Sequence, residues 1–180
     1  MKKLVLFLSF VISANLAFAQ LNDKNTSQNR KEKRKAKMEK DYQMIKDMLK
    51  NRDFVLQANF LEDKNGRRFP VNNGLNFVSV DSTEAIIQIG SNNKIGANGV
   101  GGITAKGKIT RWEMTENLKK NFFSLRLNVM TAVGFYDLYF SISPTGQATT
   151  ELTGLSNGRL TFDGNIVPLE NSSIYEGQSL

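Results

Sequence analysis

Apolar and polar residues alternate along the second half of the chain, between residues 121 and 169. In the first such run the apolar side chains share one parity and the polar ones take the other; the apolar positions are Phe123, Leu125, Leu127 and Val129. A two-residue period is typical of a β-strand with one face in the core and one in water. Three similar runs follow, separated by short Gly-, Pro-, Asn- and Ser-containing segments that favour turns. The pattern predicts four consecutive antiparallel strands.

The same alternation occurs, less regularly, upstream of this region. It predicts strands over residues 54–60, 77–82, 85–90 and 103–114. In the last of these, Trp112 falls on the opposite parity from Ile103 and Ile109. A β-bulge near Thr110 or Arg111 would restore a single inward row. Together the two halves predict a mainly β fold with about eight antiparallel strands in a meander, forming a barrel, a half-barrel or a sandwich.

A helical period precedes the strands, from about Arg30 to Asn51. The apolar residues of one helical face are Met38, Tyr42, Ile45 and Leu49, and the face is widened by Met44 and Met48. Spacings of three and four residues are those of an amphipathic helix. The pattern therefore predicts one N-terminal helix that packs a Met-rich stripe against the sheet.

The first 19 residues have the features of a secretory signal peptide. Lys2 and Lys3 precede an apolar run, and Ala17-Phe18-Ala19 supplies a small-x-small cleavage pattern. A membrane anchor is the competing interpretation, but the run is shorter than the roughly 20 residues that span a bilayer. The chain contains no cysteine, which excludes a lipid-anchored lipoprotein. We therefore expect export to the periplasm or the exterior, without a membrane span.

The rest of the chain divides by composition. A length of about 160 residues after cleavage corresponds to one domain. The expected segments are a polar, flexible leader over residues 20–29, one domain over residues 30–169 and a loose, polar tail over residues 170–180.

The formal charge of +7 is unevenly distributed. Residues 21–52 carry eleven Lys or Arg against five acids, whereas residues 53–180 carry eleven against twelve. The nearly neutral β region argues against nucleic-acid binding. The basic segment is either a solvated helix face or a contact for anionic envelope lipid or lipopolysaccharide. The residues of such a contact are Lys31, Lys33, Arg34, Lys35 and Lys37.

A glycine- and asparagine-rich stretch covers residues 91–102. Neither GxxxxGK[ST] nor GxGxxG occurs there at the head of a helix, and the segment that follows alternates like a strand. Without a helix N-terminus the stretch lacks the free amides that cradle phosphate. We expect a loop at one end of the sheet, with an apolar ligand site beneath it. The residues predicted for that site are Ile95, Val100, Ile103 and Trp112.

Several chemistries are excluded by composition. The absence of histidine and cysteine removes Ser-His-Asp and Cys-His catalysis, thiol redox chemistry and the usual zinc sites. The carboxylates fall mostly in turns or on outward strand positions, and no calcium-binding DxDxDG-like run is present. We expect a protein without enzymatic activity and without a cofactor or metal.

Short motifs occur along the chain in a particular order. They are Gly101-Gly102-Ile103, Lys108-Ile109, Trp112-Glu113, Tyr136-Asp137-Leu138, Gly146-Gln147-Ala148 and Arg159-Leu160-Thr161-Phe162-Asp163-Gly164. In their order and spacing the chain resembles the exported bacterial family catalogued as domain of unknown function 4251. It departs from the family at residues 95–100, where an aromatic, proline-containing segment is usual. The resemblance implies a small secreted envelope protein of Gram-negative bacteria, and it implies no activity.

Two functions fit these features. The first is a binding module that holds a small apolar or lipidic ligand inside a barrel. The alternative is an envelope interaction protein that contacts a protein or glycan partner through its outer sheet face, including Arg126, Phe135 and Tyr139. A lined internal pocket would favour the first function, and a packed interior with an aromatic outer face the second.

Overall fold

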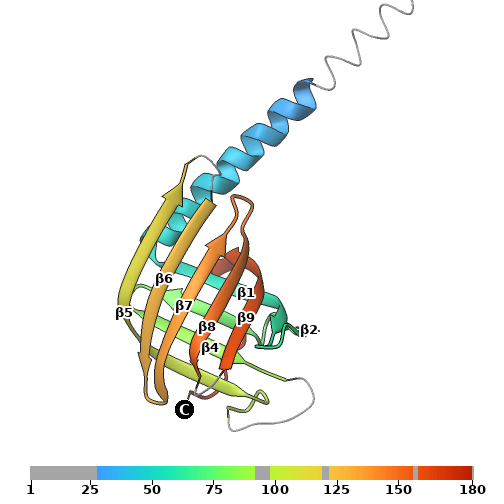
Figure 1. Ribbon diagram of the computed structural model, residues 1–180. Helices are drawn as coiled ribbons and strands as arrows, with labels where there is room; N and C mark the ends of the chain where they lie inside the picture. The colour runs from blue at the N-terminus through green and yellow to red at the C-terminus, as the bar shows by residue number, and fades with distance from the viewer. Residues whose placement is uncertain (1–27, 92–97, 119–121, 156–157, 180) are drawn as a thin grey trace, which may run out of the picture. The chain divides into compact units, whose positions relative to one another are not determined.

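The computed structural model describes residues 28–91, 98–118, 122–155 and 158–179 (Figure 1). The chain divides into two units, one ending at Lys40 and one running from Asp41 to Leu180. The helix covers residues 28–51, so its last part belongs to the second unit. The predicted signal peptide lies outside the described residues. In the part of the chain that is described, no helix is both long and apolar enough to cross a bilayer.

The second unit is an antiparallel sheet that closes on itself. Its strands are β1 (Asp53–Glu62), β2 (Arg68–Pro70), β3 (Phe77–Asp81), β4 (Glu84–Ile89), β5 (Ile103–Asn117), β6 (Phe122–Thr131), β7 (Gly134–Ile142), β8 (Gln147–Leu155) and β9 (Gly158–Val167). Neighbours pair in sequence order from β3 to β9, and β1 pairs with both β3 and β9. Eight strands therefore form a closed barrel, and β2 is an extra strand on β1. In Figure 1, β5 to β9 form one curved wall, with β1 and β4 crossing behind it. The predicted fold class is confirmed, in its barrel form.

The strand register shifts in three strand pairs, and two of these shifts bear on the side-chain directions predicted from the sequence. The β5–β6 register shifts between Ile109 and Arg111, where the sequence predicts a bulge. A second shift lies in β1, between Ala58 and Phe60. Beyond it Leu61 is buried and Phe60 is only half-buried. Simple alternation continued from Phe54 would place Phe60 inward, but the extra residue reverses the parity.

Large side chains fill the barrel interior. Phe54 meets the ring of Phe140 edge-on, with centroids 5.8 Å apart, and lies 6.3 Å from the ring of Trp112. Tyr42, from the helix, stacks on Phe123 at 5.0 Å. These contacts belong to one continuous cluster of buried residues from the helix and the strands. Within the described residues, the inward positions form one continuous hydrophobic core.

The helix contributes to this core through its last part. Tyr42, Ile45, Met48 and Leu49 are buried there, and they recur at three- and four-residue spacings. Met38 and Met44 are 48% and 47% exposed, so the predicted Met-rich stripe is wrong for both. Met44 precedes Ile45 by one residue, about 100° around the helix, and therefore points away from the core.

Two hydrogen bonds from the helix to Glu116 connect the helix to the end of β5. Lys46 Nζ donates to Glu116 Oε1 at 2.9 Å, and the Tyr42 hydroxyl donates to the same oxygen. The pKa of the Glu116 carboxyl is held below its usual range, first by the hydrogen bond from Lys46 and then by the one from Tyr42. The carboxylate thus keeps its charge where it anchors the helix.

The C-terminal segment lies along the outer face of the barrel. The Tyr175 amide donates to Gly74 O and the Gln178 amide to Asn98 O, each at 2.9 Å. Gln88, which is fully buried, donates from Nε2 to Tyr175 O at 2.8 Å. Its Oε1 accepts from the Gly177 amide at 2.8 Å. The polar composition of the tail, which predicts a loose segment, gives no indication of these contacts.

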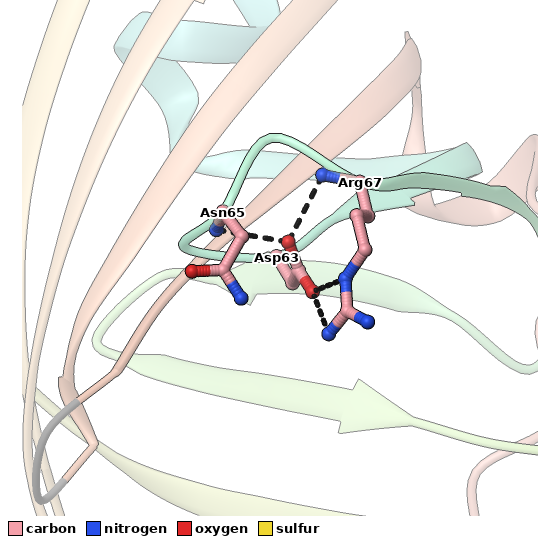
Figure 2. A network of polar contacts seen from close by, with 3 residues as sticks. All are labelled: Asp63, Asn65 and Arg67. Atoms are coloured by element: carbon pink, nitrogen blue, oxygen red, sulfur yellow. Dashed lines mark hydrogen bonds and ion pairs between the residues drawn. The ribbon is translucent and has the colours of Figure 1, made fainter.

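The turn between β1 and β2 is organised by one carboxylate (Figure 2). Asp63 Oδ1 accepts from the amides of Asn65 and Arg67, both at 2.9 Å. Asp63 Oδ2 accepts from Arg67 Nε and forms an ion pair with its Nη2, both at 2.7 Å. The pKa of Asp63 is lowered, chiefly by the hydrogen bond from the Arg67 amide and further by the Arg67 side chain.

We expect the Asp63→Asn variant to be less stable than the wild type at pH 7. Because the folded-state pKa of Asp63 is depressed, its contribution is present above the unfolded value of about 3.8 and is lost as the pH falls through the folded value. The difference in unfolding free energy should therefore shrink below about pH 4. Denaturant unfolding from neutral to acid pH measures it, with Asp137→Asn on the barrel wall as control. A pH-independent difference would contradict the expectation.

Candidate functional site

A groove of about 520 Å³ lies on the outside of the barrel, over β7, β8 and β9 and beside β1 and β2. Ser141, Thr149 and Asp163 are register partners on adjacent strands, and Asp163 pairs in turn with Phe60. These positions take the parity opposite to the buried Phe140 and Phe162, so their side chains point outward. The groove is therefore built by one outward row across four strands.

Uncharged polar side chains dominate its lining. They are Asn59, Ser141, Ser143, Gln147, Thr149 and Asn165. Gln147 and Asn165 are exposed register partners, and they extend the lining next to the outward row. Amides and hydroxyls both donate and accept hydrogen bonds. The lining can thus bind a ligand that carries both hydrogen-bond donors and hydrogen-bond acceptors.

The charged and aromatic groups gather at the β1–β2 side. Arg68 lies with its guanidinium 4.0 Å from the centroid of the Phe60 ring and forms an ion pair with Asp163. Phe122 is half-buried and also lines the groove. The guanidinium of Arg68 thus contacts both an aromatic ring and a carboxylate. The groove therefore combines polar groups with an aromatic ring and an ion-paired cation.

A second hollow of about 520 Å³ adjoins the first at Asn59. Its other lining residues are Pro70, Val71, Asn72 and Asn73. Asn59 occupies the β1 bulge, where the extra residue reorients the strand. Asn59 thus lies at the boundary between the two hollows.

The described lining of the groove lacks the pair of carboxylates that a glycosidase uses for hydrolysis. A glycosidase uses two facing carboxylates, and the lining contains one, Asp163, which is paired with Arg68. Among the residues that the structure describes, no group of three or more acidic side chains could hold a metal ion. The expectation that the protein lacks enzymatic activity stays a prediction.

Of the residues predicted for an apolar ligand site, the structure describes three and separates two of them, Ile103 and Trp112. Trp112 packs on the core and carries the Arg52 guanidinium 4.8 Å from its ring centroid. Ile103 is 44% exposed and lies nine residues away along β5, about 30 Å for an extended strand. Val100 is buried. Ile95 lies outside the described residues.

The residues predicted for anion contact lie together on the helix of the first unit. Lys31, Lys33, Arg34, Lys35 and Lys37 are all exposed there. The outer-face residues Arg126 and Tyr139 are register partners on β6 and β7, and Tyr139 and Phe135 are 51% and 70% exposed. Tyr139 precedes the groove residue Ser141 by two positions on the same face of β7, so Tyr139 lies next to the groove, whereas Phe135 lies further along the strand.

Comparison with known proteins identifies the family. The sequence model of the family described as domain of unknown function (DUF4251) matches residues 36–166. The chain belongs to the DUF4251 family. The resemblance seen in the sequence is thus confirmed. The matched region of this DUF4251 protein contains every residue that lines the groove, whereas Lys31, Lys33, Arg34 and Lys35 precede it.

A solved DUF4251 structure has a similar fold. The crystal structure of a DUF4251 family protein from Bacteroides eggerthii DSM 20697 matches with a TM-score of 0.63 and 25% sequence identity. The match covers 78% of this chain and 95% of that one. No curated protein matches the chain.

Proposed function

We propose that this DUF4251 protein is a non-enzymatic binding module that holds a glycan in its outer groove. The observation that carries the proposal is the lining, which contains amides and hydroxyls together with aromatic rings. A sugar presents hydroxyl groups at its edge and an apolar C–H face, so it can use both kinds of group at once. The second hollow beyond Asn59 favours an oligosaccharide over a single sugar.

The packed interior gives less support to an apolar ligand. Phe54, Phe123, Phe140 and Phe162 are fully buried among the inward positions of the barrel. Binding sites for apolar molecules are concave and mostly apolar, whereas both hollows described above are lined largely by polar groups. We therefore favour the outer-face function over the internal one.

Export would bring the groove to suitable ligands. The features of a signal peptide in residues 1–19 predict a periplasmic or secreted protein. A protein in that location meets the glycans of the cell envelope. Localisation of the tagged full-length chain in cell fractions tests this part of the proposal, which fails if the protein remains in the cytoplasm with residues 1–19 uncleaved.

A glycan array of neutral oligosaccharides tests the binding function, followed by calorimetric titration of the best oligosaccharide. We expect the double variant Gln147→Ala/Asn165→Ala to bind it at least about tenfold more weakly, because each lost hydrogen bond contributes about 1 kcal/mol. Both side chains are exposed, so the fold should be unaffected.

The matched control is Asp137→Ala/Thr153→Ala, another pair of register partners on the outer wall, away from the groove. It should bind like the wild type. Equal weakening by the two double variants, or no binding of the wild type to any oligosaccharide on the array, would contradict the proposal.

A further inference from the structure

The described helix of the first unit carries a concentrated positive charge. Residues 28–40 contain seven Lys or Arg and two Glu, and every one of these residues is exposed. Apart from Ala36 and Met38, this segment is polar, so it lacks the continuous apolar stripe that usually packs on a core. Its Lys and Arg side chains are therefore exposed to a possible binding surface.

The charges on this helix are segregated by face. Arg30, Lys33, Arg34 and Lys37 recur at spacings of three, one and three residues, which places them in one stripe along the axis. Lys31 and Lys35 form the adjoining stripe, which continues to Met38. We call these six Lys and Arg residues the basic face.

The two acids occupy a different side of the helix. Glu32 and Glu39 are seven residues apart with Ala36 between them, at the four- and three-residue spacings of one stripe. With 3.6 residues per turn, this stripe lies on the side opposite Arg30, Arg34 and Lys37. The helix therefore presents one nearly uniform cationic side.

We propose that the basic face binds an anionic phospholipid surface. Lipid phosphates form a plane of negative charge, which a straight cationic stripe can follow over its whole length. Lys and Arg can lay their methylene stems against the headgroup boundary while their charges remain at the phosphates. Met38 is 48% exposed beside Arg34 and Lys35, so the same side also carries an apolar side chain that can enter the boundary. This inference is independent of the groove.

Vesicle co-sedimentation of the mature chain tests the proposal. We expect binding to vesicles of phosphatidylglycerol and phosphatidylcholine, and none to phosphatidylcholine alone. The variant Arg30→Gln/Lys33→Gln/Arg34→Gln/Lys37→Gln should bind at least about a hundredfold more weakly, since each basic residue near such a surface contributes about fivefold. Binding should also fall between about 0.1 M and about 1 M salt, where the Debye length shortens from about 10 Å to about 3 Å.

A charge-preserving control distinguishes the face from net charge. The variant Glu32→Lys/Lys33→Glu/Lys37→Glu/Glu39→Lys has the composition of the wild type, but it places two carboxylates within the basic face. We expect it to bind at least about tenfold more weakly. Wild-type affinity in this variant would overturn the proposal, as would unchanged binding in the four-Gln variant. Equally tight binding of a short DNA duplex by the wild type would overturn it in favour of a general polyanion site.

Discussion

Gly164→Ala is expected to destabilise the protein by about 3 kcal/mol or more, because it places a methyl group in the seam that closes the barrel. A Cβ at this position would lie 1.9 Å from Gln57 O and 2.8 Å from Ala58 Cα. Gly164 pairs with Ala58 beside the β1 bulge, in the contact between β1 and β9. The clashing atoms belong to the backbone, so no change of rotamer can relieve them.

Denaturant unfolding gives the loss of stability, and amide hydrogen exchange shows where the structure opens. We expect faster exchange in β1 and β9 and little change between β6 and β7. Gln57→Gly should not rescue the variant, since the Gln57 side chain is not the obstacle.

Gly66→Ala is the matched control for this experiment. Gly66 has φ +79°, and a Cβ there meets nothing within 4 Å, so the substitution tests backbone strain alone. It should cost about 1–2 kcal/mol. Wild-type stability in Gly164→Ala would mean that β1 and β9 approach less closely in solution.

The strands could be predicted from the sequence because the alternation of apolar and polar residues indicates which face of each strand is buried. Leu125 and Leu127 are fully buried, and Arg126 between them is exposed. The β5 bulge was also predictable, since Trp112 breaks the parity of an otherwise regular run. In both cases the signal lies within one strand, where hydrophobicity reports the local environment.

Closure of the barrel and the groove could not be predicted in the same way. β1 and β9 are far apart in the chain, and their pairing depends on the twist and stagger accumulated over the intervening strands. The β1 bulge could not be predicted from the pattern of apolar residues, because Phe60 and Leu61 are both apolar and either could be the inward residue. Phe60 and Asp163 therefore become neighbours only in the closed structure. The short β2 was hidden in a polar connection that contains Pro70.

Gln88→Leu is expected to destabilise the protein by about 3 kcal/mol and to release the C-terminal segment. Gln88 is fully buried, and its amide makes four hydrogen bonds, to Leu75 O, Tyr175 O, the Gly177 amide and the Thr104 hydroxyl. Leucine has a similar size but cannot form hydrogen bonds, so the four groups that bond to Gln88 would lose a buried hydrogen-bond partner. Each buried polar group left unsatisfied costs about 1–3 kcal/mol, and release of the tail lets some of them reach water.

The amides of Gly177 and Gln178 should therefore exchange fast in Gln88→Leu, whereas those of β6 to β8 remain protected. A double-mutant cycle with a chain ending at Asn171 separates tail docking from core packing. If Gln88 acts by holding the tail, the two changes should be coupled by more than about 1 kcal/mol. Additive losses would assign its contribution to Thr104 and Leu75 instead, because those contacts remain when the tail is absent. Protected Gly177 and Gln178 amides in Gln88→Leu would likewise show that the other contacts of the tail hold it without Gln88.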